Sequence, residues 1–377
     1  MGYIYSEETK ELVEAVRDFC NKEVKEQCRE YDRTGEWPKA IYDQAKEMQL
    51  HMMEIPEEYG GLGLDTVSVA AIIEEMAQAD AGFALTFAVS NLAVKGTLKF
   101  GNEAQKKKVF EKIISGDFGA FALTEPQAGS DASNVKTTAR REGDSYVLNG
   151  RKCFITNGGV AGIYLIMALT DKTKGLKGMS AFIVEAGTPG LSTGKHEDKM
   201  GIRCSNTCDV VMDECRIPAE NLLGKEGEGF KIAMQVLDIA RTFVGCLAVG
   251  IAQRAMNEAV AYGKERVQFG KPIVKNQAIA FKIADMEIQI ETARQMVAHS
   301  CRRMDMGLSY GKESAITKCY CSDIAMKVAS ESIQIFGGYG YSREYPVEKL
   351  LRDAKIHQIF KGTNEIQRVV ISNYILK

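Results

Sequence analysis

The 377-residue sequence has no concentrated block of lysine or arginine, and its 48 basic and 50 acidic residues nearly cancel. Nucleic-acid-binding proteins usually carry such a block, so we expect no nucleic-acid partner. No apolar run approaches the roughly 20 residues of a membrane-spanning helix, and the first residues (MGYIYSEETKEL) lack the apolar stretch of a secretion signal. We therefore expect a soluble, cytoplasmic protein with no membrane segment.

Histidine is scarce, with four residues, and the ten cysteines are scattered without a CxxC pair. Zinc sites usually need closely spaced Cys or His ligands, so we expect no metal. Free cysteine often serves as a small buried hydrophobic residue. The cysteines are therefore expected to be reduced thiols in an intracellular compartment.

The sequence does have enough apolar material for a large core, because 45% of its residues are hydrophobic. A chain of this length normally forms two or three packed domains. Apolar residues recur at spacings of three and four up to about residue 118 and again beyond about 226, whereas short β-rich segments fill the part between. We expect a helical domain over 1–118, a β domain over 119–225 and a second helical domain over 226–377.

The expected elements follow from these patterns. In the first domain we expect one amphipathic helix over 3–24 and another over 66–79, where Glu74 and Glu75 look like surface charges. Long helices are expected in the last domain over 230–263, 276–306 and 313–336. The middle part predicts an antiparallel sheet or barrel with strands at 120–123, 137–141, 145–148, 164–169, 180–185 and 209–212.

Two segments of the β domain have residues suited to binding a flat polar ring. Residues 121–131 (FALTEPQAGSD) run from a strand into a Gly/Ser turn, whose amides and hydroxyls can approach such a ring. Residues 154–158 (FITNG) place an aromatic side chain beside a hydroxyl, for stacking and hydrogen bonding. An ordinary β-turn and an ordinary strand explain the same residues.

Two segments of the last domain suit a diphosphate. Residues 266–273 (RVQFGKPI) place a guanidinium and an aromatic ring at a helix end. Residues 334–341 (QIFGGYGY), followed by 362–368 (GTNEIQR), contain glycines that let backbone amides close on a pyrophosphate. A solvated arginine and a loop that needs positive φ angles are the alternatives.

Together and in this order, these segments resemble the acyl-CoA dehydrogenase family, and the resemblance covers essentially the whole chain. It implies an N-terminal α-helical domain, a middle antiparallel β-barrel domain and a C-terminal four-helix-bundle domain. It also implies FAD as cofactor, an acyl-CoA thioester as substrate, an electron-transferring flavoprotein as electron acceptor and a homotetramer.

The resemblance further assigns residues to each ligand. The flavin ring and ribityl chain of FAD would be surrounded by Phe121, Leu123, Thr124, Gly129, Ser130, Phe154, Ile155 and Thr156. The adenosine diphosphate half, bound across a subunit contact, would meet Arg266, Gln268, Phe269, Gln277, Gln334, Gly337 and Gly338, and Thr363, Asn364 and Glu365 would complete the site. The substrate would contact Ser130, Asp238, Arg241 and Gly362.

The sequence departs from the family at the catalytic base. In most members a Glu directly before Gly-Thr removes the proton beside the thioester, and here that residue is Lys361. A second branch, which includes isovaleryl-CoA dehydrogenases, carries the Glu on a helix at the position of Ala240. An ammonium with a reference pKa of about 10.4 is a poor proton acceptor at neutral pH. The Lys361 backbone amide can still donate to the thioester carbonyl, together with a flavin ribityl hydroxyl.

One branch that the chain resembles acts on alicyclic enoyl thioesters in the degradation of aromatic compounds. It converts cyclohex-1-ene-1-carboxyl-CoA to the cyclohexa-1,5-diene and removes a γ proton, so its base lies on another wall of the pocket. That branch carries an Asp in the region matching residues 83–92, where this chain has Asn91. Asn keeps the shape of Asp but loses its basicity. Asn91 either marks the γ-proton site, orients the substrate or has only a structural role.

Three hypotheses follow. The first is a 1,4-dehydrogenase of an alicyclic enoyl-CoA. The second is an ordinary short-chain or branched-chain α,β-dehydrogenase, or an enoyl-CoA reductase, with a relocated base. The third is a flavin-bearing acyl-CoA-binding protein without turnover, or a variant that has lost its base.

Overall fold

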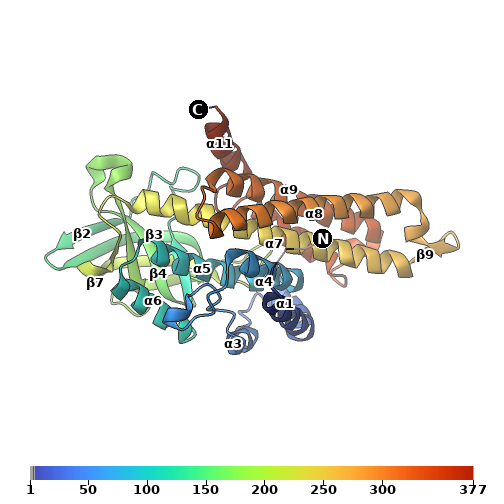
Figure 1. Ribbon diagram of the computed structural model, residues 1–377, viewed down its shortest axis with the longest axis horizontal. Coiled ribbons are helices and arrows are strands. Elements are labelled where there is room, and N and C mark those ends of the chain that lie inside the picture. The colour runs from blue at the N-terminus through green and yellow to red at the C-terminus, as the bar shows by residue number, and fades with distance from the viewer. Residues whose placement is uncertain (1–2, 4, 377) are drawn as a thin grey trace.

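The computed structural model describes residues 3 and 5–376 and divides into three parts along its long axis (Figure 1). The N-terminal part consists of helices, which are α1 (Glu7–Phe19), α2 (Lys25–Thr34), α3 (Lys39–Glu47), α4 (Thr66–Ala79), α5 (Ala81–Phe100) and α6 (Glu103–Ile114). A π-helical turn over Cys20–Val24 joins α1 to α2, so the helix expected over 3–24 changes its winding at residue 20. The helix also begins at Glu7 and not at residue 3, because the Ser6 side chain caps it by accepting a hydrogen bond from the Thr9 amide. Residue 4 of the expected range lies outside the described residues.

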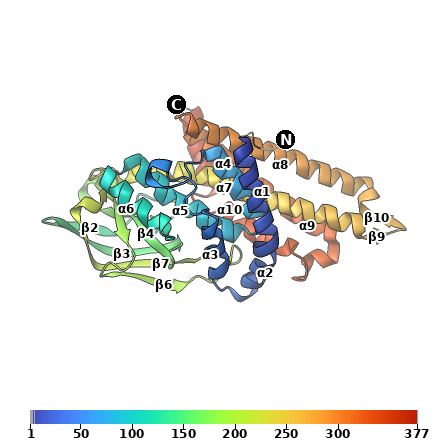
Figure 2. The same ribbon diagram turned by 60° about the horizontal axis from the view of Figure 1, so that its bottom comes forward.

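The middle part is an eight-stranded sheet with the order β6-β7-β3-β2-β4-β5-β8, and β1 pairs with β4. Its strands are β1 (Phe118–Ala122), β2 (Thr138–Glu142), β3 (Ser145–Thr156), β4 (Ala161–Leu169), β5 (Met179–Glu185), β6 (Leu191–His196), β7 (Thr207–Pro218) and β8 (Leu222–Leu223). Most pairs are antiparallel as expected, but β4 runs parallel to β1 and, at one residue pair, to β2. Helices α5 and α6 lie against this sheet (Figure 2).

The C-terminal part contains the three long helices expected there, α7 (Gly229–Glu265), α8 (Gln277–Asp305) and α9 (Gly311–Phe336). They lie side by side (Figure 1), followed by α10 (Val347–His357) and by α11 (Asn364–Ile375), which projects from the body. A two-stranded hairpin, β9 (Val267–Gln268) with β10 (Lys271–Pro272), extends beyond the ends of α7 and α8. Helix α7 packs against α9, α8, α4 and α5, so it joins the N-terminal and C-terminal parts.

By length and composition alone, α5 and α7 are apolar enough to cross a membrane, which corrects the expectation that no run approaches that length. However, 89% of the most apolar stretch of α5 and 78% of that of α7 are buried inside the protein. Core helices pass the same test, so the two helices are weak evidence of a membrane span.

Glu74 corrects the expectation of two surface charges on α4. It is 4% exposed, and its carboxylate accepts hydrogen bonds from Nε (2.9 Å) and Nη2 (2.7 Å) of Arg294 on α8. Glu75 instead faces Arg17 of α1, whose side chain is 48% exposed. The two neighbouring glutamates therefore form one buried and one solvent-exposed ion pair, each joining α4 to another helix.

We predict that these pairs contribute very unequally to stability. Arg294→Met strands the buried Glu74 carboxylate and lowers the free energy of unfolding by about 3–5 kcal/mol. Arg17→Met, the matched control, removes an exposed pair worth about 0.2–1 kcal/mol. Denaturant unfolding of both variants at pH 7 measures the difference, and equal losses would contradict the assignment.

Candidate functional site

A buried ion pair holds the Gly/Ser turn that follows β1. Glu125 accepts hydrogen bonds from Lys152 Nζ (2.7 Å) and from the backbone amides of Lys136 (2.6 Å) and Thr137 (3.0 Å). Lys152, on β3, also donates to the Leu123 carbonyl (3.1 Å). The turn is thus fixed to the sheet at its base, which leaves its tip free to meet a ligand.

Electrostatics strengthen this attachment. Burial lowers the pKa of Lys152 to about 8, with Glu125 acting in the opposite direction. Burial alone would raise the pKa of Glu125, but Lys152 and the backbone donors outweigh it and the pKa falls below its usual value. At neutral pH both groups are therefore charged and mutually neutralised. In the sequence, Glu125 stands in a motif without an assigned role, and Lys152 was not predicted as a functional residue.

Some of the residues expected around the flavin ring are buried in the β domain, and others are exposed on its surface. Phe121, Leu123, Ile155 and Thr156 are buried in the fold, and Thr124 is half-buried. Gly129 and Ser130, at the tip of the turn, are exposed. A Cβ atom at Gly129 would meet no other atom within 4 Å, so the surface in front of this backbone is open.

Phe154 lies at an irregularity of the sheet that turns its ring outward. The register of β3 against β7 shifts between Lys152 and Ile155, and Phe154 adopts a positive φ of 55°. Its side chain is 66% exposed, which is unusual for a large aromatic residue. A strained backbone that displays an aromatic ring suits stacking against a planar ligand.

Asn157 fixes the chain directly after this bulge. Its Nδ2 donates to the carbonyls of Thr86 on α5 and Gly119 on β1, both at 3.0 Å. The FITNG segment therefore connects the sheet to the helix that carries Asn91, and the Asn of the motif has a structural role.

Five of the residues expected at the adenosine diphosphate half of FAD line one cavity of about 570 Å³, which we name the α7–α9 cavity. Most of its lining residues belong to the hairpin and to the ends of α7 and α9 beside it, so the cavity lies at the end of the molecule from which the hairpin extends in Figure 1. Its lining includes Arg266, Gln268, Phe269, Gly337 and Gly338, with Tyr262 and Tyr339 beside them. Gln277 and Gln334 are exposed and not part of that lining.

The chemistry of the α7–α9 cavity fits a charged, ring-containing ligand. The Arg266 guanidinium lies 5.5 Å from the centre of the Tyr339 ring, and Phe269 is 97% exposed at the hairpin turn. A Cβ atom at Gly337 or Gly338 would meet nothing within 4 Å, so the surface in front of this backbone is open, while the Gly337 amide itself donates to the Ile333 and Gln334 carbonyls at the end of α9. A guanidinium, an open glycine backbone and exposed aromatic rings suit the adenosine diphosphate half of FAD.

The turn before α11 is fixed by a buried polar network. Thr363 caps the helix by accepting a hydrogen bond from the Ile366 amide (3.3 Å). Asn364 accepts from Lys318 Nζ (2.8 Å) and donates to Ser322 Oγ (2.9 Å), so its amide is used inside the protein. Burial lowers the pKa of Lys318 to about 7. Glu365, by contrast, is exposed.

Asp238 and Arg241 form an ion pair on α7, with Nη1 of Arg241 donating to the carboxylate of Asp238. Burial lowers the pKa of Arg241 and raises that of Asp238. The Arg241 Nε atom is buried and has no hydrogen-bond partner among the described residues. It is therefore a donor available to an anionic or carbonyl ligand.

Lys361 lies in a strained turn, with φ 56°, and is followed by Gly362 with φ 88°. Burial lowers the pKa of Lys361 to about 8. No ion pair joins Lys361 to a carboxylate within residues 3 and 5–376, and its Nζ lies 6.0 Å from the centre of the Phe360 ring. Ala240, the other position considered for a base, is a buried methyl group.

Asn91 lies on α5 and is 1% exposed. Asp80 starts this helix by accepting a hydrogen bond from the Phe83 amide (2.8 Å). The Asn91 Nδ2 atom is buried and has no hydrogen-bond partner in the described part of the chain. No hydrogen bond among the described residues joins Asn91 to Lys361.

Sequence models of the three domains of acyl-CoA dehydrogenases match the chain, the N-terminal domain over residues 6–117, the middle domain over 120–215 and the C-terminal domain over 227–376. An acyl-CoA dehydrogenase of Bacillus subtilis is 47% identical over 363 residues, which are 96% of each chain. The acryloyl-CoA reductase (NADH) of Anaerotignum propionicum is 44% identical and covers 100% of this chain and 96% of its own.

The fold agrees with these matches. The solved structure of butyryl-CoA dehydrogenase from Megasphaera elsdenii superimposes with a TM-score of 0.97, at 45% identity and full coverage of both chains. The chain belongs to the acyl-CoA dehydrogenase family, whose members are FAD-dependent oxidoreductases that act on CH–CH groups.

Proposed function

We propose that the protein oxidises a compact alicyclic enoyl-CoA, converting cyclohex-1-ene-1-carboxyl-CoA to cyclohexa-1,5-diene-1-carboxyl-CoA. The observation that carries the proposal is the amine of Lys361 at the position where the family usually has a carboxylate. The second possible position, Ala240, has no carboxylate either. A carboxylate is thus missing from both places where the family takes the proton beside the thioester. An enoyl thioester does not need that proton removed, because its acidic hydrogen is on the γ carbon.

The reaction balances as loss of a γ proton from one ring carbon and of a hydride from the saturated carbon on the other side of the thioester-bearing carbon. The existing double bond shifts, and a second forms in conjugation. FAD would supply the hydride acceptor and would be held by the turn after β1, Phe154 and the α7–α9 cavity. The Lys361 backbone amide would bind the thioester carbonyl, and Arg241 with Asp238 would face the CoA portion.

Position 91 is the proposed site of γ-proton transfer. The supporting observation is the buried Asn91 amide nitrogen, which has no hydrogen-bond partner among residues 3 and 5–376, in a helix whose neighbouring residues Ala84 and Ala88 are small and buried. Because an amide is not a base, Asn91 in this chain would orient the substrate rather than accept the proton. Oxidation by the chain as it stands is therefore expected to be slow.

A second candidate function is reduction of a short enoyl-CoA. Two observations favour it, namely the name of the 44% identical acryloyl-CoA reductase and the proton that Lys361 carries below its pKa of about 8. An ammonium behind the thioester can deliver a proton to the carbon beside the carbonyl while the flavin supplies the hydride.

We propose a cytoplasmic homotetramer that exchanges electrons with an electron-transferring flavoprotein. Apolar residues that the chain leaves exposed support the assembly, namely Phe269 on the hairpin, Phe281 and Ile288 on α8, and Ile375 and Leu376 at the end of the projecting α11. Exposed apolar residues grouped on projecting elements are typical of subunit contacts.

The substrate assignment predicts a selective loss of flavin absorbance in anaerobic titrations. Cyclohex-1-ene-1-carboxyl-CoA should bleach the flavin and butyryl-CoA should not. Asn91→Asp should raise the bleaching rate by about 10² to 10⁴-fold, because it supplies a general base. Asn91→Leu, which has similar size but no acid, should not raise it.

Other results would point elsewhere. Bleaching by butyryl-CoA alone would favour an α,β-dehydrogenase, and spectral shifts without bleaching in the wild type and in Asn91→Asp would favour a binding protein. Reoxidation of the reduced flavin by crotonyl-CoA but not by the cyclic diene would favour the reductase.

A second prediction concerns the missing base. Lys361→Glu restores the carboxylate beside the thioester and should confer bleaching by butyryl-CoA at a rate about 10² to 10⁴-fold above wild type. Lys361→Gln, with similar length and no charge, is the control and should not confer it. If both variants behave alike, the residue does not lie behind the thioester.

A third prediction follows from the pKa of Lys361. The folded-state pKa of about 8 lies below the unfolded value of about 10.4, so between these values the unfolded chain binds more protons and stability rises with pH. Below pH 8 the half-buried ammonium destabilises the fold. Lys361→Met should therefore raise the unfolding temperature at pH 7, and the gain should disappear near pH 10.5. A gain that does not change with pH would contradict the burial of this amine.

A further inference from the structure

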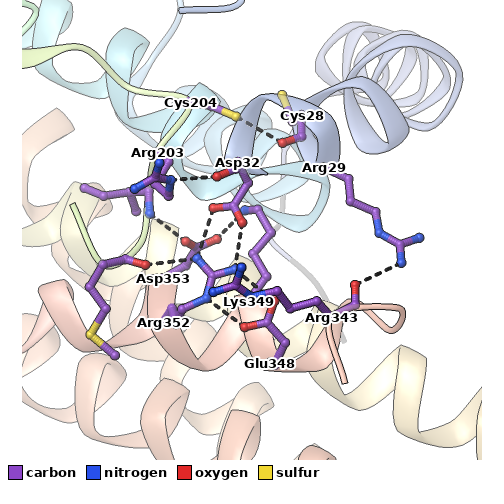
Figure 3. Close-up of polar contacts among 12 residues, drawn as sticks. Cys28, Arg29, Asp32, Arg203, Cys204, Arg343, Glu348, Lys349, Arg352 and Asp353 are labelled. Atoms are coloured by element: carbon purple, nitrogen blue, oxygen red, sulfur yellow. Dashed lines mark hydrogen bonds and ion pairs between the residues drawn. The ribbon is translucent and has the colours of Figure 1, made fainter. Parts of the chain in front are cut away.

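A second cavity lies away from the site described above, between α2, the loop before β7 and the start of α10. Its volume is about 470 Å³, and we name it the α2–α10 cavity. Figure 3 shows most of its polar side chains converging from these three segments. Seven cationic and three acidic residues line it, namely Arg29, Arg33, Lys199, Arg203, Arg343, Lys349 and Arg352 with Asp32, Asp198 and Glu348.

The three carboxylates of the lining are already bound. Asp32 receives Nη1 (3.1 Å) and Nη2 (2.6 Å) of Arg352, and Glu348 receives Nε (2.7 Å) and Nη2 (2.9 Å) of the same guanidinium. Asp198 pairs with Arg203 at 2.5 Å. These three carboxylates therefore neutralise Arg352 and Arg203. The other five cations of the lining have no carboxylate partner within the lining.

Two further cations have partners outside the lining. Lys349 lies between Asp80 (2.6 Å) and Asp353 (2.5 Å), and Arg33 pairs loosely with Glu30 at 3.4 Å. These contacts account for four of the seven cations.

The remaining three, Arg29, Lys199 and Arg343, have no carboxylate partner among residues 3 and 5–376. The Arg29 guanidinium donates to the backbone carbonyls of Arg343 and Glu344, as Figure 3 shows for the first of them. Lys199 Nζ donates to the Ser205 carbonyl at 2.9 Å. Backbone carbonyls satisfy hydrogen bonds but do not cancel charge.

The excess of positive charge affects the pKa of Lys199. Burial lowers the pKa of Lys199, and the neighbouring Arg203 lowers it further. An anion in the cavity would reverse the second effect. The three cations without a carboxylate partner come from three segments, which are α2, the loop before β7 and the residues just before α10. Their positive charges surround the same cavity.

We infer that the α2–α10 cavity binds a small phosphate-bearing anion, of the size of pyrophosphate or a nucleoside diphosphate. One arginine guanidinium can bind a phosphate group through two parallel hydrogen bonds, and a lysine adds a point charge. The volume lies within the range of roughly 300–1,000 Å³ that is usual for small-molecule sites.

The cavity is separate from the cofactor site but adjacent to it. Tyr345, which lines it, packs edge-on against Phe336 (5.5 Å between ring centres) and Tyr339 (5.5 Å). Both of these rings line the α7–α9 cavity. An anion held by Arg343 therefore binds two residues away from the aromatic group that supports the FAD site.

Isothermal titration of the FAD-loaded protein with pyrophosphate, at low ionic strength, tests this inference. We expect saturable binding of one anion per chain. Arg29→Gln and Arg343→Gln should each weaken binding about 10-fold or more, since a hydrogen bond to a charged group contributes about 1.5–3 kcal/mol. Arg29→Lys should retain part of the affinity. Arg302→Gln, an exposed arginine on α8, is the matched control and should leave affinity unchanged.

Parallel titrations identify the source of the phosphate. ADP binding more tightly than pyrophosphate indicates a nucleotide, whereas equal affinities indicate a free phosphate compound. The inference is overturned if the wild type binds neither ligand saturably, if Arg302→Gln loses as much affinity as Arg343→Gln, or if a hexaglutamate peptide binds more tightly than either ligand. Because FAD already fills its own site in this experiment, failure of the dehydrogenase assignment would not change the result.

Discussion

Charge removed from water needs a partner, and this constraint accounts for how the three parts of the chain are joined. Glu74 and Arg294 connect the N-terminal helices to α8, Lys349 connects α10 to the start of α5 through Asp80, and Glu125 with Lys152 fixes the ligand-facing turn to the sheet. Breaking such a pair leaves a buried charge that costs several kcal/mol. Against this pattern, the buried Lys318 and the half-buried Lys361 have no carboxylate partner among the described residues, and only Lys318 is bound by an amide oxygen, that of Asn364.

Helix positions could be predicted from the sequence where one periodic pattern dominated. The three long C-terminal helices were predicted to within two residues at each end, because amphipathic spacing and the Gly337-Gly338 stop are local signals. Strand β6 (Leu191–His196) was missed, because it is an edge strand whose exposed residues after Leu191 show no alternation. The parallel pairing of β1 with β4 depends on which strands meet across some forty residues, and no local pattern encodes that.

The candidate site shows the same division. The structure brings five residues of the predicted motifs together in the α7–α9 cavity, and the motifs could point to them because glycine, arginine and aromatic residues in loops are local signals. Glu74 was wrongly placed on the surface, because a charged residue on a helix reveals nothing about a guanidinium 220 residues away. Lys152 and Lys318 were missed for the same reason. A lysine in a strand or helix is expected in solvent unless the fold brings it a partner.

The two candidate functions differ in which side chain moves the proton, and the structure makes their demands unequal. With a pKa of about 8, roughly nine-tenths of Lys361 is protonated at pH 7, so the group can donate a proton but only a small fraction can accept one. Reduction of an enoyl thioester needs a donor and uses the chain as it stands. Oxidation of a ring needs an acceptor, and the buried amide of Asn91 becomes one only when a single atom is exchanged. In the proposed site, a positive charge behind the thioester would assist both directions, because each passes through an enolate-like state that a nearby cation stabilises. Under this proposal, lysine at position 361 would remove the proton acceptor of the family reaction and add a cation that stabilises its transition state.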